Sequence, residues 1–135
     1  MSRQAALTFM DDPRAYQSDG LVAHISGAVS GKKELLDKLA DGLGLPAHFG
    51  HNWDALEESL REFSWAKGAR SIAIVHEELP VRLSEDDLRI YLEILAESVA
   101  ELRKAKDSVP ALQVVFPVTA RKRIHQLLPQ LGPLP

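Results

Sequence analysis

The stretch LPAHFGHNWDALEESLREF, residues 45–63, contains the signals that decide how the middle of the chain folds. Pro46 ends a preceding helix and Gly50 allows a sharp turn, so we expect this stretch to begin as an irregular loop. Asn52 has a side chain suited to an N-cap, and an amphipathic segment follows it. The pattern therefore predicts a loop that leads directly into a helix over residues 53–63.

Two opposite stripes run along this predicted helix when successive residues are turned by about 100°. The apolar stripe consists of Trp53, Leu56, Leu60 and Phe63. The acidic stripe consists of Asp54, Glu58 and Glu62. An apolar stripe is what a domain core needs, whereas like charges four residues apart destabilise a helix by about 0.2–0.5 kcal/mol per pair. Helix stability therefore does not explain the acidic stripe.

Residues 45–63 account for the net charge of the whole chain. They contain four acidic residues, of which Glu57 is the one outside the stripe, and one basic residue, Arg61, for a formal charge of −3. Removing these from the chain's 19 acidic and 16 basic residues leaves 15 of each. Two interpretations stay open: a solvated acidic helix face, or a docking surface for a basic partner.

Length and composition restrict the class of protein. The 135 residues suit one core, so we expect residues 1–135 to form a single domain. The absence of cysteine excludes a disulfide framework, a thiol nucleophile and a cysteine-based zinc site. No run approaches the ~20 apolar residues of a membrane span, no secretory signal opens the sequence, and a mildly acidic chain is unsuited to nucleic acid. We therefore expect a cytoplasmic protein that binds neither membranes nor nucleic acid.

Strands and helices alternate along the chain, which is typical of parallel sheets with right-handed crossovers. Strands are predicted at residues 20–25, 71–75 and 112–116, and a short extra strand can form at 6–9. Further helices are predicted at 30–43 (capped by Ser30), 84–106 and 119–128. We therefore predict a small two-layer α/β domain with a three-stranded parallel sheet packed with helices. Its core spans about residues 20–118, between extensions at 1–19 and 119–135, and the last seven residues are expected to fray.

The segment LPAHFGHNWDALEESL, residues 45–60, resembles the signature stretch of the barstar family, the small intracellular inhibitors of barnase-type ribonucleases. The matching positions are Leu45, Pro46, Phe49, Gly50, Asn52, Asp54, Ala55 and Leu56, with Glu58 as an acid in place of an acid. A weaker match is formed by AESV at 96–99 and LRKAK at 102–106. The resemblance covers roughly residues 20–116, leaves both termini unmatched, and implies the small α/β architecture predicted above.

The resemblance implies a non-enzymatic inhibitor without a cofactor or a metal. Asp54 and Glu58 would be the central anions, with His48, Gly50 and Asn52 on the adjoining loop. The other residues expected at this partner surface are Glu57, Arg61 and Glu62. Because ribonuclease active sites gather cationic side chains to hold phosphate, carboxylates on a rigid helix can occupy such a site. The implied partner is a basic, toxin-type ribonuclease.

Several residues depart from the family pattern. His48 and Glu57 stand where the family's inhibitor has aromatic residues, and Glu58 is one methylene longer than the family's aspartate. Arg61 places a positive charge beside the acidic stripe, and Lys104 stands where another acidic contact is expected. These differences predict a different partner, an altered specificity among ribonucleases, or a fold retained without inhibition.

Two other functions remain as alternatives. The first is a barstar-like interaction module whose partner is not a nuclease. The second is a small metal-dependent enzyme that uses His48 and His51, although these lie in a glycine-containing loop and no further ligand set is apparent. His24 and His76 fall at strand positions and are expected to be structural. No G-x-S-x-G motif or glycine-rich phosphate loop supports another enzyme class.

Overall fold

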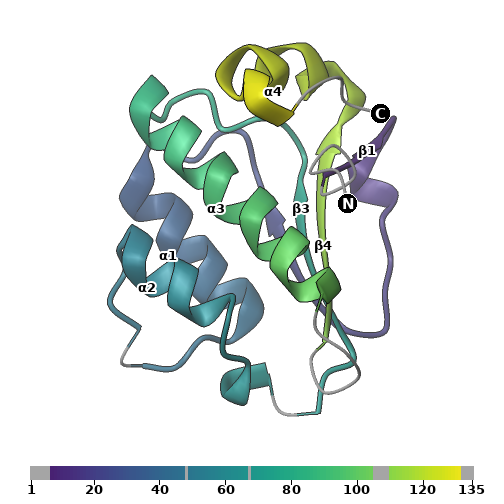
Figure 1. The fold of residues 1–135 in the computed structure, drawn as a ribbon, viewed down its shortest axis with the longest axis vertical. Helices are drawn as coiled ribbons and strands as arrows, with labels where there is room; N and C mark the ends of the chain where they lie inside the picture. The colour runs from purple at the N-terminus through teal and green to yellow at the C-terminus, as the bar shows by residue number, and fades with distance from the viewer. Residues whose placement is uncertain (1–6, 48, 67, 105–109, 132–135) are drawn as a thin grey trace.

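The computed structural model describes residues 7–47, 49–66, 68–104 and 110–131. Within these ranges four parallel strands form one sheet in the order β1-β4-β3-β2 (Figure 1). The strands are β1 (Thr8–Met10), β2 (Leu21–Ile25), β3 (Ser71–His76) and β4 (Ala111–Pro117). The α-helices are α1 (Lys32–Leu43), α2 (Trp53–Ser59), α3 (Glu85–Lys104) and α4 (Arg121–Leu127). None of these helices is long and apolar enough to cross a membrane, and the α/β class is as predicted.

The sheet has one strand more than the three that the sequence predicts. The additional strand, β1, lies beside β4 with Thr8 opposite Val115, and the ring of Phe9 lies 6.5 Å from that of Phe116. With three residues, β1 is too short to show the alternation by which strands are recognised, so residues 6–9 gave only a weak signal. Part of the N-terminal extension therefore belongs to the sheet.

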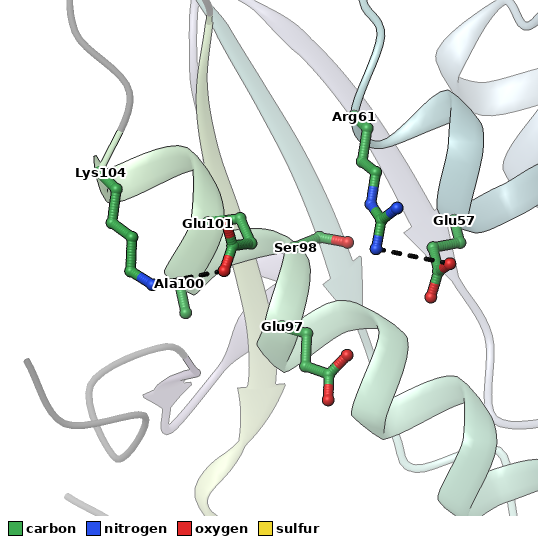
Figure 2. A pocket seen from close by; sticks show the side chains of 7 residues that line it. All are labelled: Glu57, Arg61, Glu97, Ser98, Ala100, Glu101 and Lys104. Carbon is green, nitrogen blue, oxygen red and sulfur yellow. Dashed lines mark hydrogen bonds and ion pairs between the residues drawn. The ribbon is translucent and has the colours of Figure 1, made fainter.

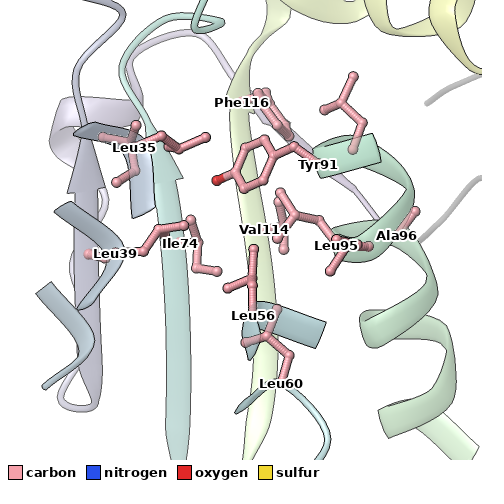
Figure 3. Close-up of a cluster of buried hydrophobic side chains, with 14 of the residues drawn as sticks. Leu35, Leu39, Leu56, Leu60, Ile74, Tyr91, Leu95, Ala96, Val114 and Phe116 are labelled. Carbon is pink, nitrogen blue, oxygen red and sulfur yellow. The ribbon is translucent and has the colours of Figure 1, made fainter. Parts of the chain in front are cut away.

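The helices pack on one face of the sheet and form a two-layer domain (Figure 1). The core combines side chains from the helices and the sheet, and Figure 3 shows part of it, with Leu35, Leu56, Tyr91, Ile74 and Val114 close together. The opposite face carries a smaller cluster around Val75 and Val115, against which Tyr16 packs. The large core lies directly beneath α2, so this helix has a firm apolar support.

The start of α1 differs from the sequence prediction. Gly31, not Ser30, is the N-cap, and no side chain caps this end. Instead the backbone N–H of Ser30 donates to the carboxylate of Glu34 at 3.0 Å. Near the other end, a Cβ on Gly42 would lie 2.7 Å from the Cβ of Ala23. Glycine at this position therefore lets α1 lie close against β2.

The long helix α3 begins as the sequence predicts, because the hydroxyl of Ser84 accepts a hydrogen bond from the N–H of Asp87 at 3.1 Å. The described part of α3 ends at Lys104, and the predicted continuation to residue 106 lies outside the described residues. Of the last seven residues, which were expected to fray, Pro129–Leu131 instead form a 3-10 helix, and residues 132–135 lie outside the described residues.

A polar pair lies inside the core, where α3 crosses the sheet. His76 Nδ1 lies 2.9 Å from the carbonyl oxygen of Val115, and Nε2 lies 2.6 Å from the hydroxyl of Tyr91. Because a carbonyl only accepts, Nδ1 carries the proton and Nε2 accepts from the Tyr91 hydroxyl. The imidazole also stacks on Phe116 at 4.0 Å. Burial lowers the pKa of His76 to about 4 and raises the pKa of Tyr91, so both groups are neutral near pH 7.

Candidate functional site

The helix α2 starts at the N-cap that the sequence predicts. The side-chain oxygen of Asn52 accepts a hydrogen bond from the backbone N–H of Ala55 at 2.7 Å. The backbone carbonyl oxygen of Asn52 accepts another from the N–H of Leu56 at 3.0 Å. Leu56 is fully buried beneath the helix, and Trp53 packs at the edge of the core, as expected. Asp54 lies in the first turn, where a negative charge is favourable to the helix dipole.

The helix ends earlier than predicted, at Ser59 rather than at residue 63. Glu62 therefore lies beyond α2, and its carboxylate accepts hydrogen bonds from the N–H of Ser64 at 2.7 Å and from its hydroxyl at 2.8 Å. These bonds turn the chain into a 3-10 helix over Ser64–Ala66. The acidic stripe on the helix thus consists of two residues, because the third is used to shape the following turn.

Asp54 and Glu58 project from α2 into solvent at the rim of a hollow of about 410 Å³. Neither carboxylate forms an ion pair or a hydrogen bond with any residue that the structure describes. The apolar part of the hollow is lined by Pro46, Phe49, Ala55 and Trp65. The site therefore combines two unneutralised anions with an apolar surface large enough to receive a side chain.

Glu57, on α2, and Arg61, which follows α2, do not line this hollow. They form an ion pair at 3.5 Å and line a groove of about 620 Å³ between α2 and α3 (Figure 2). Across the groove, Lys104 pairs with Glu101 at 3.4 Å. Arg61 and Lys104 thus neutralise neighbouring glutamates, and within the described part of the chain neither forms an ion pair with Asp54 or Glu58.

The loop before α2 has its strained residue one position later than expected. Gly50 lines the hollow, but His51 is the residue in the left-handed region, at a φ of 52°. The ring of His51 is held by Phe49, whose carbonyl oxygen lies 2.9 Å from Nδ1, and by Asp37, whose Oδ1 lies 3.4 Å from Nε2. His48 lies outside the described residues. Among the residues described, no group of three or more His, Cys, Asp or Glu could hold a metal ion.

Sequence reasoning missed two residues that shape this site. Trp65 lines the hollow, and its indole N–H donates to the carbonyl of Ser59, the last residue of α2. Asp87, on α3, accepts a hydrogen bond from the indole N–H of Trp53 at 3.2 Å. The second contact joins residues 34 positions apart, so periodicity along one helix contains no signal for it.

One of the comparisons with known proteins identifies a similar family. A family model described as Barstar (barnase inhibitor) matches residues 21–115, well over half of the chain. A search of curated proteins gives no match. The matched range runs from β2 into β4 and includes α2, the hollow and the groove-lining part of α3, whereas β1 and α4 lie outside it.

Proposed function

The chain belongs to the barstar family, and we propose that it inhibits a basic ribonuclease of the barnase type by placing α2 and its preceding loop in the enzyme's active site. The observation that carries this proposal is the pair of exposed carboxylates, Asp54 and Glu58, without a cationic partner among the described residues. The helix that carries this pair is short, and its other face is buried. In a family of inhibitors, such a pair is best explained as a binding site for a cationic group of another protein.

The chemistry of the two surfaces is complementary. A ribonuclease must hold phosphate and stabilise the charge that develops on it, so its active site presents cationic side chains. Carboxylates form charge-assisted hydrogen bonds with such groups, and the arginine contacts are often bidentate. Within the described residues, Asp54 and Glu58 have no ion pair to break when they form these bonds. Their attraction to a basic protein also accelerates the encounter.

The hollow beside the two carboxylates fits the same kind of partner. Its aromatic lining, Phe49 and Trp65, suits the apolar stem or the planar head of an arginine, while Asp54 and Glu58 lie at its rim. In this proposal Asn52 positions α2 and Gly50 leaves space for the enzyme. The other proposed contact residues are His48, Glu57, Arg61 and Glu62, of which Glu62 acts mainly through the shape of its turn.

The proposal is tested by measuring cleavage of RNA by barnase in the presence of the purified protein. We expect stoichiometric 1:1 inhibition with micromolar or tighter affinity. Replacement of Asp54 and Glu58 by alanine should abolish inhibition at the same concentrations. If neither barnase nor another basic ribonuclease of this type is inhibited, and pull-downs recover only proteins that are not nucleases, the chain is an interaction module and the proposal is wrong.

A further inference from the structure

We propose that the two tryptophans of the chain clamp the two ends of α2, and that Trp53 and its partner Asp87 are positioning residues for the carboxylates of Asp54 and Glu58. This role rests on the proposed function, because the carboxylates are positioned for the ribonuclease. It assigns a task to residues that need not touch the enzyme.

The helix α2 requires such support. It has seven residues, whereas isolated helices below about 12 residues are marginal in water. Asp54 and Glu58 repel each other at i, i+4, and Glu58 lies near the C-terminal end, where the helix dipole disfavours an anion. Local interactions such as the Asn52 N-cap are therefore not sufficient to hold the two carboxylates in place, and contacts with the rest of the fold must contribute.

The first clamp holds the N-terminal end of α2 against α3. Trp53 is the first residue of α2 and precedes Asp54 directly; its indole N–H donates to Asp87 Oδ1 at 3.2 Å. Its ring stacks on Tyr91 with centroids 5.9 Å apart, and the ammonium group of Lys32 lies 5.2 Å from the ring centroid. Tyr91 is itself fixed by the buried hydrogen bond to His76. A continuous set of contacts thus joins the start of α2 to the central strand β3.

The second clamp holds the C-terminal end. The last carbonyls of a helix lack partners within the helix. The indole N–H of Trp65 donates to one of them, that of Ser59, at 3.0 Å. The ring of Trp65 lies 5.5 Å from that of Phe63, which packs against the core. Both tryptophans therefore use their single polar group to fix the same two-turn helix, one from each end.

The two clamps differ in how cleanly they can be tested. Trp65 lines the hollow beside Glu58, so its replacement could also remove a direct contact with the enzyme. Trp53 does not line this hollow, and its polar atom points to α3. The decisive variants are therefore Trp53→Phe, which keeps an aromatic ring on Tyr91 but removes the donor, and Asp87→Ala, which removes the acceptor. Asp87→Asn keeps an acceptor oxygen and is the matched control.

The binding experiment is a double-mutant cycle with barnase as the probe. Trp53→Phe and Asp87→Ala should each weaken binding by about tenfold, the size expected for one lost hydrogen bond to a charged group. Asp87→Asn should retain most of the affinity. In the background of Asp54→Ala with Glu58→Ala, Trp53→Phe should have no further effect, because there is nothing left to position. An equal loss in both backgrounds would mean that Trp53 contacts barnase directly, and no loss in the wild-type background would mean that the clamp is not needed; either result overturns the proposal.

Hydrogen exchange without a partner separates this proposal from the proposed function. The backbone amides of residues 56–60 should exchange faster in Trp53→Phe and in Trp65→Phe than in the wild-type chain, while those of β3 stay unchanged. Faster exchange supports the clamps even if barnase is not inhibited, in which case only the choice of partner fails. Unchanged exchange at these amides overturns the clamps even if barnase is inhibited.

Discussion

The helices α2 and α3 both carry exposed acidic residues, but the fold treats these acids differently. On α3, Glu85 and Asp86 pair with Arg89 at 3.1 and 3.3 Å. On α2, Asp54 and Glu58 have no such partner among the described residues. Glu85 and Asp86 of α3 therefore complete the fold, whereas Asp54 and Glu58 of α2 are available to another molecule. Composition alone does not distinguish the two helices.

The comparison is tested most strongly by removing the acids of each helix in turn. Asp54→Ala combined with Glu58→Ala should weaken binding to barnase by about 1,000-fold, since truncating one partner of a buried charge pair costs about 2–5 kcal/mol. The measurement is isothermal titration calorimetry. The same variant should unfold at the same denaturant concentration as the wild type or slightly higher, because it breaks no ion pair among the residues that the structure describes.

The matched control is Glu85→Ala combined with Asp86→Ala. These acids have the same charge and lie at a helix start, but they are paired within the fold. The control should leave the affinity for barnase unchanged and lower stability by about 1 kcal/mol or less, as for other exposed ion pairs. Equal losses of affinity in both double variants would show that net charge, rather than the α2 surface, determines binding.

A second test concerns the buried contact between His76 and Tyr91, which joins α3 to the sheet, rather than the charges of α3. The pKa of His76 is about 4 in the folded chain and near 6.5 when unfolded. Between these values the unfolded chain binds a proton that the folded chain does not, so stability falls as the pH drops from about 6.5 to 4 and is fully present above 6.5. The expected contribution is about 3 kcal/mol.

Chemical denaturation at pH 7 and pH 4 measures this effect. His76→Gln should be less stable than the wild type at pH 7 but should show a smaller decrease on acidification. The same decrease in both proteins would assign the pH dependence to groups other than His76.

The dependence of binding on salt should test whether the carboxylates of Asp54 and Glu58 on α2 attract the enzyme, unlike the acids of α3 that are paired with Arg89. Raising ionic strength from about 0.05 to 0.3 M should weaken binding to barnase by about tenfold, mainly through slower association, because exposed charges are screened over a Debye length of about 10 Å at 0.1 M. Stopped-flow association rates provide the measurement. A salt-independent association rate would exclude electrostatic attraction by Asp54 and Glu58.

The smallest expected effect concerns the cation beside the site. Arg61 follows α2 and pairs with Glu57, and its positive charge should oppose the approach of a basic enzyme at this contact. Arg61→Ala should therefore tighten binding to barnase by about threefold, in the range of exposed ion pairs. Arg89→Ala, which removes the corresponding cation of α3, should not change affinity. Weaker binding of Arg61→Ala would indicate that the enzyme presents an acidic group to Arg61.

Local sequence signals predicted the features that depend on neighbouring residues. Asn52 identified the start of α2, the apolar spacing identified Leu56 and Leu60 as buried, and the alternation of strands and helices identified the parallel sheet. The early end of α2 was not predicted, because it follows from the contacts of Glu62 with Ser64.

Features that depend on distant contacts could not be predicted. The indole of Trp53 reaches Asp87 on another helix, and β1 is recognisable as a strand only beside β4. Whether Asp54 and Glu58 form ion pairs within the fold also depends on distant contacts, because a basic residue from any part of the chain could have folded against them. The sequence therefore located the acidic surface, and the structure was needed to show which acids are unneutralised.

Competition for the active site of barnase tests the central claim most directly. Calorimetric titration of barnase with the protein should give 1:1 binding of micromolar or better affinity, and saturating the enzyme beforehand with an uncleavable RNA oligonucleotide should abolish it. That result would follow if Asp54 and Glu58 occupy the phosphate-binding site. Binding of the same strength to the RNA-filled enzyme would contradict the account, because α2 would then lie elsewhere.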